Sequence, residues 1–126
     1  MNQYKDIESR ADLDLIVEKF YDHLLVDEVV GFLFTEVVKL NLKEHLPRLV
    51  DFWEDQLFGT RNYSGNPMRV HLQLHQKSAL EKEHFNRWLE LFNQTIDSHF
   101  SGPKAHLAKE RALSIATVMQ IKVASI

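Results

Sequence analysis

The chain has 126 residues, a length that fits one domain around a single hydrophobic core. Apolar residues make up 44% and charged residues 26% of it, the balance of an ordinary folded protein rather than a disordered one. A net charge of −3 without a basic stripe, the lack of cysteine and the lack of a long apolar run argue against nucleic-acid binding, disulfides and a membrane span. We therefore expect one domain over residues 1–126 with no nucleic-acid or membrane partner. The polar first ten residues, unlike a signal peptide, predict a cytoplasmic protein.

Helical periodicity dominates the first half of the chain. Apolar residues recur every three or four positions from Leu13 to Leu24, which predicts an amphipathic helix. The short apolar segment 29–34 fits either a helix or an irregular stretch. A third pattern predicts a helix from about Val37 to Leu57, which Gly59 would end.

The second half contains two breaks rich in Gly and Pro. The first runs from Gly59 to Pro67, and its last two residues predict the start of a short helix over Met68–Leu74. A longer amphipathic helix is predicted over Ala79–His99. A last helix would open at Pro103, with Ser101 or Gly102 as its cap. No segment alternates apolar and polar residues over the length of a strand, so the predicted fold class is all-α.

Seven histidines make metal or haem binding worth testing residue by residue. A surface position is expected for His23, His99 and His106, which lie among polar neighbours or near helix ends. His71 and His75 are spaced for half of a zinc site, but no carboxylate at a helpful spacing completes it.

One further pair has the spacing of a di-iron ligand motif. Glu81 and His84 are three residues apart, as in the helical bundles that bind two iron atoms. Those sites need two such pairs and two more glutamates, and the sequence contains one pair. A di-iron centre is therefore not expected.

A second group of polar side chains lies on predicted apolar faces. His45 shares its face with apolar residues four, seven and eight positions later, and Tyr21 and Trp88 lie on the inward faces of their own helices. Each alone reads as an ordinary core residue. Together with an inward His71 they form a set of donors that a plain core does not need, but that a pocket for a partly charged ligand does.

Several motifs with ordered spacing cover most of the chain, from about Leu15 to Met119. They are Phe20-Tyr21, Phe34, Lys43-Glu44-His45-Leu46, Phe52-Trp53, Leu57-Phe58-Gly59-x-x-x-Tyr63-x-Gly65-x-Pro67-x-x-x-His71-x-x-Leu74, His84-Phe85-x-Arg87-Trp88-Leu89-x-Leu91-Phe92-x-x-Thr95 and Ala112-x-x-Ile115-Ala116-x-x-Met119. In this order and spacing, they resemble the truncated, or two-over-two, globins and within them the third group. The Gly-Gly signals of the other groups are absent.

The resemblance implies a two-over-two helical sandwich that encloses haem b. It makes His71 the proximal ligand of the iron and places Tyr21, His45 and Trp88 on the distal side. The apolar slot for the haem would be formed by Phe34, Leu49, Phe52, Trp53, Phe85 and Phe92, and its entrance would contain Tyr63, Met68 and Arg69. Arg69 would be a partner for a propionate.

The sequence departs from the family pattern at two places. The Asp-Pro-x-Leu-x-Pro run that is common before Phe34 appears here as Asp27-Glu28-Val29-Val30-Gly31-Phe32, without either proline. Leu42 stands where a Trp is frequent. These departures concern the backbone before Phe34 and the packing near His45, and they leave the iron ligand unchanged.

The function that the resemblance implies is reversible binding of O₂, and of NO and CO, at five-coordinate iron. His45 is a third donor, a gate for the ligand or an endogenous sixth ligand, and the sequence does not choose among these. Chemistry with NO or peroxide would need a separate reductase, because no flavin- or nicotinamide-binding motif is present. Two other functions remain open: a haem-free helical domain that binds a protein, and a gas sensor that acts through a separate partner. A monomer is expected.

Overall fold

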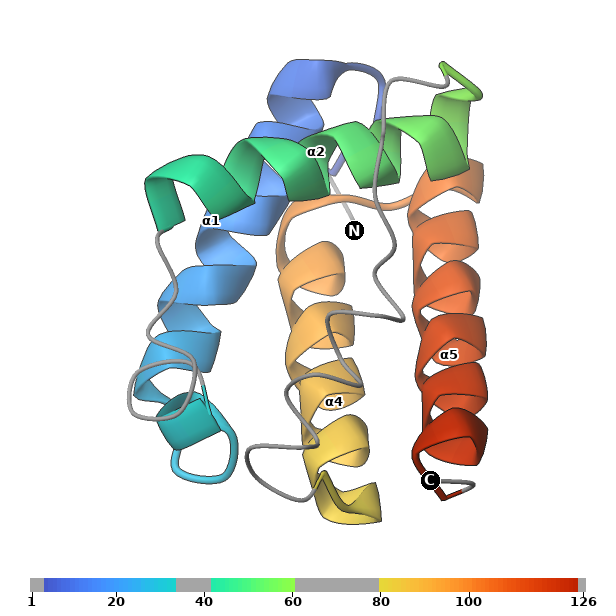
Figure 1. Ribbon diagram of the computed structural model, residues 1–126. Helices are drawn as coiled ribbons and strands as arrows, with labels where there is room; N and C mark the ends of the chain where they lie inside the picture. Colours follow the sequence, from blue (N-terminus) through green and yellow to red (C-terminus); the bar gives the residue numbers. More distant parts are fainter. Residues whose placement is uncertain (1–3, 34–41, 61–79, 125–126) are drawn as a thin grey trace.

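The computed structural model describes residues 4–33, 42–60 and 80–124, and the structural statements below concern these residues. They form four α-helices, α1 (Arg10–Val26), α2 (Leu42–Phe58), α4 (Lys82–His99) and α5 (Pro103–Ala124) (Figure 1). No strand occurs in this part of the chain. The predicted all-α class is confirmed.

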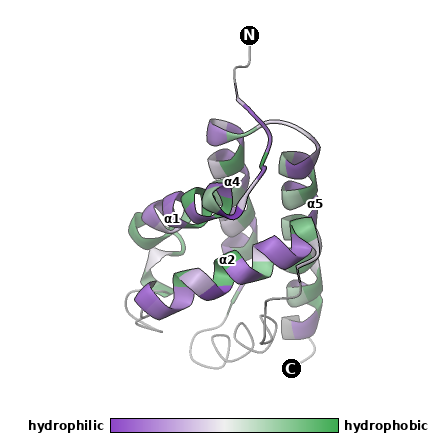
Figure 2. Ribbon diagram, turned by 90° about the horizontal axis from the view of Figure 1, so that it is seen from above, coloured by the Kyte–Doolittle hydropathy of each residue, from purple (hydrophilic) through white to green (hydrophobic). Residues whose placement is uncertain are grey.

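The helices form two stacked pairs. α1 packs against α2, and α4 packs against α5. The two pairs meet because α1 also contacts α4 and α2 also contacts α5. Seen from above, α2 presents mainly hydrophilic residues to the outside (Figure 2). This is the two-over-two arrangement that the sequence predicts.

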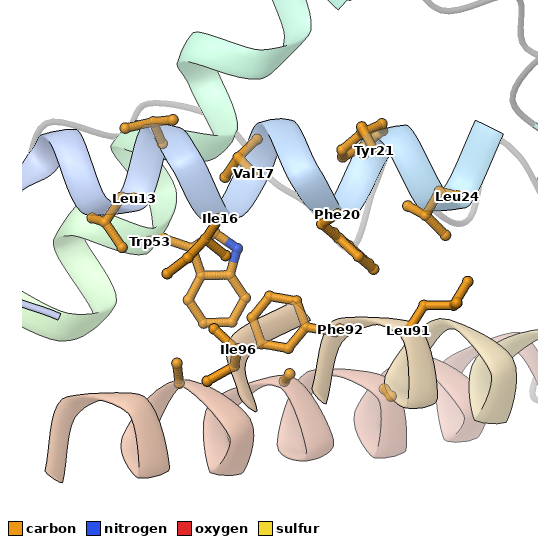
Figure 3. Packing of buried hydrophobic residues seen from close by; sticks show 14 of the residues in the cluster. Leu13, Ile16, Val17, Phe20, Tyr21, Leu24, Trp53, Leu91, Phe92 and Ile96 are labelled. Carbon is orange, nitrogen blue, oxygen red and sulfur yellow. The ribbon is translucent and has the colours of Figure 1, made fainter. Parts of the chain in front are cut away.

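The apolar stripe of α1 is the centre of the core. Its buried side chains recur at helical spacing and include Leu13, Ile16, Val17, Phe20, Tyr21 and Leu24. Phe20 points toward α4, where Phe92 and Ile96 are fully buried (Figure 3). Each large apolar side chain buried in this way contributes about 1.5–3 kcal/mol, which outweighs the modest helix propensity of the aromatic and branched residues.

The ends of α2 and α4 follow from local capping. Gly59 ends α2 as predicted: its φ is +68°, and its backbone N–H donates to the carbonyl of Asp55. The first five residues of the helix predicted from Val37 lie outside the described residues. α4 begins at Lys82 rather than Ala79, because the backbone N–H of Glu81 donates to Nδ1 of His84 over 2.9 Å and fixes the helix start there.

The start of α5 at Pro103 confirms Gly102 as the cap position and adds a side chain from a distant residue. His106 N–H bonds to the carbonyl of Gly102, so the cap position falls there, but neither Ser101 nor Gly102 supplies the side chain. The Asp6 carboxylate, 98 residues away, accepts the backbone N–H groups of Lys104 and Ala105, each over 2.9 Å. A Cβ on Gly102 would lie 2.6 Å from the Asp6 side chain, so this close approach requires glycine. The N-terminal segment is thereby fastened to the corner between α4 and α5.

The remainder of α5 packs through small side chains. The buried residues on its inner face are Ala105, Ala108, Ala112, Ala116 and Met119. Alanine at this spacing lets α5 approach the neighbouring helices closely. None of the described helices is long and apolar enough to cross a membrane.

Candidate functional site

Two of the predicted distal residues are in direct contact. The Tyr21 hydroxyl of α1 lies 2.9 Å from Nε2 of His45 on α2, and the two rings meet edge to face with centroids 5.6 Å apart. Tyr21 is 6% exposed and His45 is half-buried. The helical period aims both side chains inward, as the apolar faces of the two helices predict.

Burial fixes the charge state of the tyrosine. Loss of hydration raises the pKa of the Tyr21 hydroxyl well above its ordinary value, because the phenolate would lie in an apolar environment. The hydroxyl therefore keeps its proton at neutral pH and above. It is a neutral group that can donate one hydrogen bond and accept others.

An aromatic cluster continues from this pair toward α4. Phe20 is its hub, with edge-to-face contacts to Tyr21, Trp88 and Phe92 at centroid distances of 5.7, 5.7 and 5.2 Å. Trp88 and Phe92 stack with centroids 5.8 Å apart and an interplanar angle of 11°. The third predicted distal residue, Trp88, is thus joined to Tyr21 through Phe20.

α2 closes the cluster on the other side. Trp53 stacks on Phe92 at 4.9 Å, and its ring lies between α1 and α4 (Figure 3). Phe52 packs edge to face on Trp53, with centroids 5.4 Å apart, and half-buried Leu49 also borders the core. Phe85, at the start of α4, is buried in the same core. The structure therefore brings all the described members of the predicted slot into one cluster.

The remaining predicted site residues lie outside the described residues. They are Phe34, Tyr63, Met68, Arg69 and His71, and with them His75. Their roles as slot, entrance and iron ligand remain predictions from the sequence.

The other histidines are placed as follows. His23 and His106 are exposed, as expected, and His106 pairs with Glu110 over 3.0 Å. His99 was expected at the surface but is half-buried, because its Nδ1 lies 3.0 Å from the carbonyl of Thr95 one turn earlier. The Nδ1 atom of His84 accepts the backbone N–H of Glu81 at the start of α4. In the part of the chain that is described, no three His, Cys, Asp or Glu side chains gather where they could hold a metal ion.

The sequence motifs contain Phe20 but predict no role for it in the site. Its signals are its adjacency to Tyr21 in the first motif and its position on the apolar stripe. Two charged residues named in the sequence patterns were also given no role. Asp27, just after α1, and Arg87, just before Trp88, form an ion pair with a distance of 2.7 Å between the Arg87 terminal nitrogen and Asp27 Oδ1.

The arrangement combines polar tips with apolar walls. Its polar atoms are a neutral hydroxyl and an imidazole, held against each other by a hydrogen bond, with the Trp88 indole nearby in the same cluster. Its walls are aromatic rings. Such a site fits a flat aromatic cofactor that carries a small, partly negative ligand. The rings would bury the cofactor, and the hydrogen-bond donors would stabilise the ligand.

Comparison with known proteins supports this interpretation. The sequence model of the family described as bacterial-like globin matches residues 2–124. The group 3 truncated hemoglobin ctb of Campylobacter jejuni is 28% identical over 108 residues, which make up 83% of each chain. The group 1 truncated hemoglobin GlbN of Mycolicibacterium paratuberculosis is 32% identical over 82 residues, 65% of this chain and 56% of that protein.

A solved structure agrees with the fold. The crystal structure of the group III truncated hemoglobin from Campylobacter jejuni superimposes with a TM-score of 0.82 at 23% identity. The match covers 96% of this chain and 95% of the other. The fold formed by the four described helices is therefore that of a truncated haemoglobin.

Proposed function

Because the chain belongs to the bacterial-like globin family, within the truncated haemoglobins, we propose that it is a haem b protein that binds O₂ reversibly, with NO and CO as alternative ligands. The observation that carries the proposal is the hydrogen bond between buried Tyr21 and half-buried His45. A buried polar pair costs desolvation that an apolar pair would avoid. Its presence at the edge of an aromatic cluster is best explained by a polar ligand.

The hydrogen bond between Tyr21 and His45 has two possible directions. If Nε2 of His45 is the acceptor, the Tyr21 proton is directed at the imidazole. If Nε2 carries the hydrogen, the imidazole donates to the Tyr21 oxygen, and the Tyr21 O–H turns away from His45. We propose that the second arrangement serves ligand binding, because it lets the hydroxyl donate to a ligand that gains negative charge. His45 then orients the donor.

The cofactor would be held by His71, with the described slot residues around it. Haem would supply an iron atom with one coordination position for a diatomic ligand. The chain's own contribution is to exclude water with the aromatic cluster and to aim Tyr21 and Trp88 at that ligand. Hydrogen bonds to a charged acceptor are stronger than neutral ones, so O₂ gains more from these donors than CO does.

The experiment that tests the proposal is a haemin titration of the purified protein followed by its absorption spectrum. The wild type is expected to give a sharp haem band that shifts on reduction under CO. In His71→Ala this band is lost or strongly perturbed. His106→Ala is the control, because that histidine has a side chain that is 71% exposed and pairs with Glu110. It is expected to behave as the wild type.

The outcomes separate the proposal from its rivals. A colourless wild type that takes up no haem would return the chain to the class of haem-free interaction domains. A haem band that persists unchanged in His71→Ala would keep the haem but refute the ligand. A gas sensor acting through a separate partner would share the spectra and differ in needing that partner.

The same donors also suit removal of NO with O₂. We propose this reaction as the use to which O₂ binding is put, with electrons supplied by a separate reductase, because turnover needs a reductant. Its test is the rate of NO consumption by the reduced protein in the presence of O₂. Loss of the Tyr21 hydroxyl should slow it. A rate equal to that of the buffer would restrict the function to binding.

A further inference from the structure

The Asp27 side chain connects three parts of the molecule. It follows directly after α1 and is 5% exposed. Its Oδ1 accepts the Arg87 Nε–H over 2.8 Å and lies 2.7 Å from a terminal nitrogen of the same guanidinium. Its Oδ2 accepts the backbone N–H groups of Val29 and Val30 over 3.0 and 3.1 Å. Both carboxylate oxygens are therefore used.

The turn after α1 depends on this carboxylate. Residues 28–33 contain no proline that would stiffen them. The turn is closed by Asp27 Oδ2 and by the bond from the Gly31 N–H to the Asp27 carbonyl, 3.0 Å long. A Cβ on Gly31 would lie 2.9 Å from the Leu25 carbonyl oxygen, so the chain passes close over the last turn of α1. The path of residues 28–33 is set at this point.

Arg87 links the Asp27 carboxylate to α4. It directly precedes Trp88, whose ring contacts Phe20 and stacks on Phe92. Asp27 lies six residues after Tyr21 along α1 and its end. The two helices that present Tyr21 and Trp88 are therefore joined by an ion pair that adjoins Trp88 in sequence. The hydrogen bond from Arg87 is the main cause that lowers the pKa of the Asp27 carboxyl, so the pair is ionised at neutral pH.

We propose that Asp27 and Arg87 are positioning residues for the distal pocket: their ion pair sets the separation of α1 and α4, and with it the placing of the Trp88 indole relative to Tyr21. This inference rests on the proposed function for its consequence in ligand binding. Two nitrogens of the Arg87 guanidinium, Nε and a terminal one, meet the same oxygen, Asp27 Oδ1, and this contact defines distance and orientation together, which a lysine or a purely apolar contact does not. Neither residue contacts the ligand itself, since both act through the helices that carry the donors.

The test uses the two tryptophan indole N–H resonances of the ¹⁵N-labelled full chain, Trp53 and Trp88, which are the only two in the sequence. In Arg87→Met we expect the Trp88 signal to shift or broaden and the Trp53 signal to stay in place. Its O₂ release is expected to be faster by about threefold or more, the scale of coupling through packed elements. The infrared CO stretching band should shift in the same variant. Arg87→Lys should lie between this variant and the wild type.

Two controls remove similar contacts elsewhere. Lys109→Met deletes the pair between Lys109 and Asp97, which also joins two helices at 2.6 Å and whose lysine side chain is 31% exposed, against 32% for Arg87. Glu90→Gln removes the negative charge that Arg87 meets within α4, at 2.7 Å, and spares Asp27. Both are expected to keep the wild-type Trp88 signal and O₂ release.

The outcomes are distinct. Wild-type Trp88 signals in folded Arg87→Met, or equal shifts in Lys109→Met, would overturn the proposal. If Arg87→Met does not fold, Arg87→Lys is the deciding variant, because it keeps the positive charge but lacks the planar guanidinium. An unchanged Trp88 signal in Arg87→Lys would also overturn the proposal. A wild type without haem uptake would refute the proposed function, while the indole signals of the protein as purified would still report on the positioning.

Discussion

α1 and α2 meet through two polar contacts of opposite character. Near the start of α1, Arg10 lies 2.7 Å from Asp51 and 3.2 Å from Glu54, and its side chain is 41% exposed. Further along α1, Tyr21 forms a hydrogen bond with His45 and is 6% exposed. Exposed ion pairs gain little because water screens them, whereas a buried polar pair must recover the desolvation of both partners. We therefore expect the first contact to contribute little to stability, whereas the second has a desolvation cost that points to function.

The largest expected effect comes from removing the buried hydroxyl. Tyr21→Phe deletes one donor and keeps the ring against Phe20. A lost hydrogen bond to a charged acceptor costs about 1.5–3 kcal/mol, so O₂ release should accelerate about tenfold or more. CO release should change less. Stopped-flow displacement of O₂ by CO measures the first rate, and replacement of CO by NO measures the second.

The exposed contact provides the control for this experiment. Arg10→Met lies on the same helix and should leave O₂ release unchanged. Equal rates in Tyr21→Phe and wild type would show that the buried hydroxyl does not face the ligand, and the contrast between the two contacts would then lose its functional meaning.

A smaller effect is expected at a contact of intermediate exposure, the Asp6 carboxylate at the start of α5. Burial raises its pKa, but the backbone N–H groups of Lys104, Ala105 and Ile7 outweigh this, and the net shift is downward from 3.8. Asp6→Asn keeps one acceptor oxygen and turns an amide toward these donors. The loss should be about 1 kcal/mol of the free energy of unfolding at pH 7, typical of a lost N-terminal cap.

The sign of its pH dependence follows from the lowered pKa. Stabilisation by Asp6 is fully present above pH 3.8 and is lost as the pH falls through the lower pKa of the folded state. The difference between wild type and Asp6→Asn should therefore shrink below pH 3.8. Urea titrations at neutral pH and at pH 3 measure it. A difference that stays constant over this range would show that the carboxylate charge plays no part.

The sequence is sufficient to predict the four described helices and their inward faces. Periodicity places Tyr21 and His45 on buried faces before their contact is known, and Gly59 correctly ends α2. It fails where the partner is distant. The cap of α5 comes from Asp6, 98 residues earlier, and Arg87 finds Asp27 across 60 residues. No local sequence pattern predicts contacts between residues this far apart in the chain, because the fold determines which of them meet.

Local signals also fail when a side chain competes with the periodic pattern. The apolar spacing extends the predicted helix back to residue 79, but the His84 ring accepts the Glu81 N–H and fixes the start of α4 three residues later. The same Glu-x-x-His spacing is shared by metal ligands and by helix caps. Only the hydrogen-bond partner of the ring distinguishes the two uses.

The smallest effect is expected for the exposed contact of Arg10 with α2. Arg10→Met should lower the free energy of unfolding by about 0.5 kcal/mol, within the range of surface ion pairs, and 1 M salt should reduce this loss because the screening length falls to about 3 Å. Two carboxylates share this guanidinium, and Glu54 is the less exposed of them, with a side chain that is 14% exposed. A loss above about 2 kcal/mol that ignores salt would therefore mean that Arg10 and Glu54 behave as a buried pair. The Arg10 contact would then be as important to the α1–α2 interface as the hydrogen bond between Tyr21 and His45. Burial alone would then not distinguish a contact that serves stability from one that serves ligand binding.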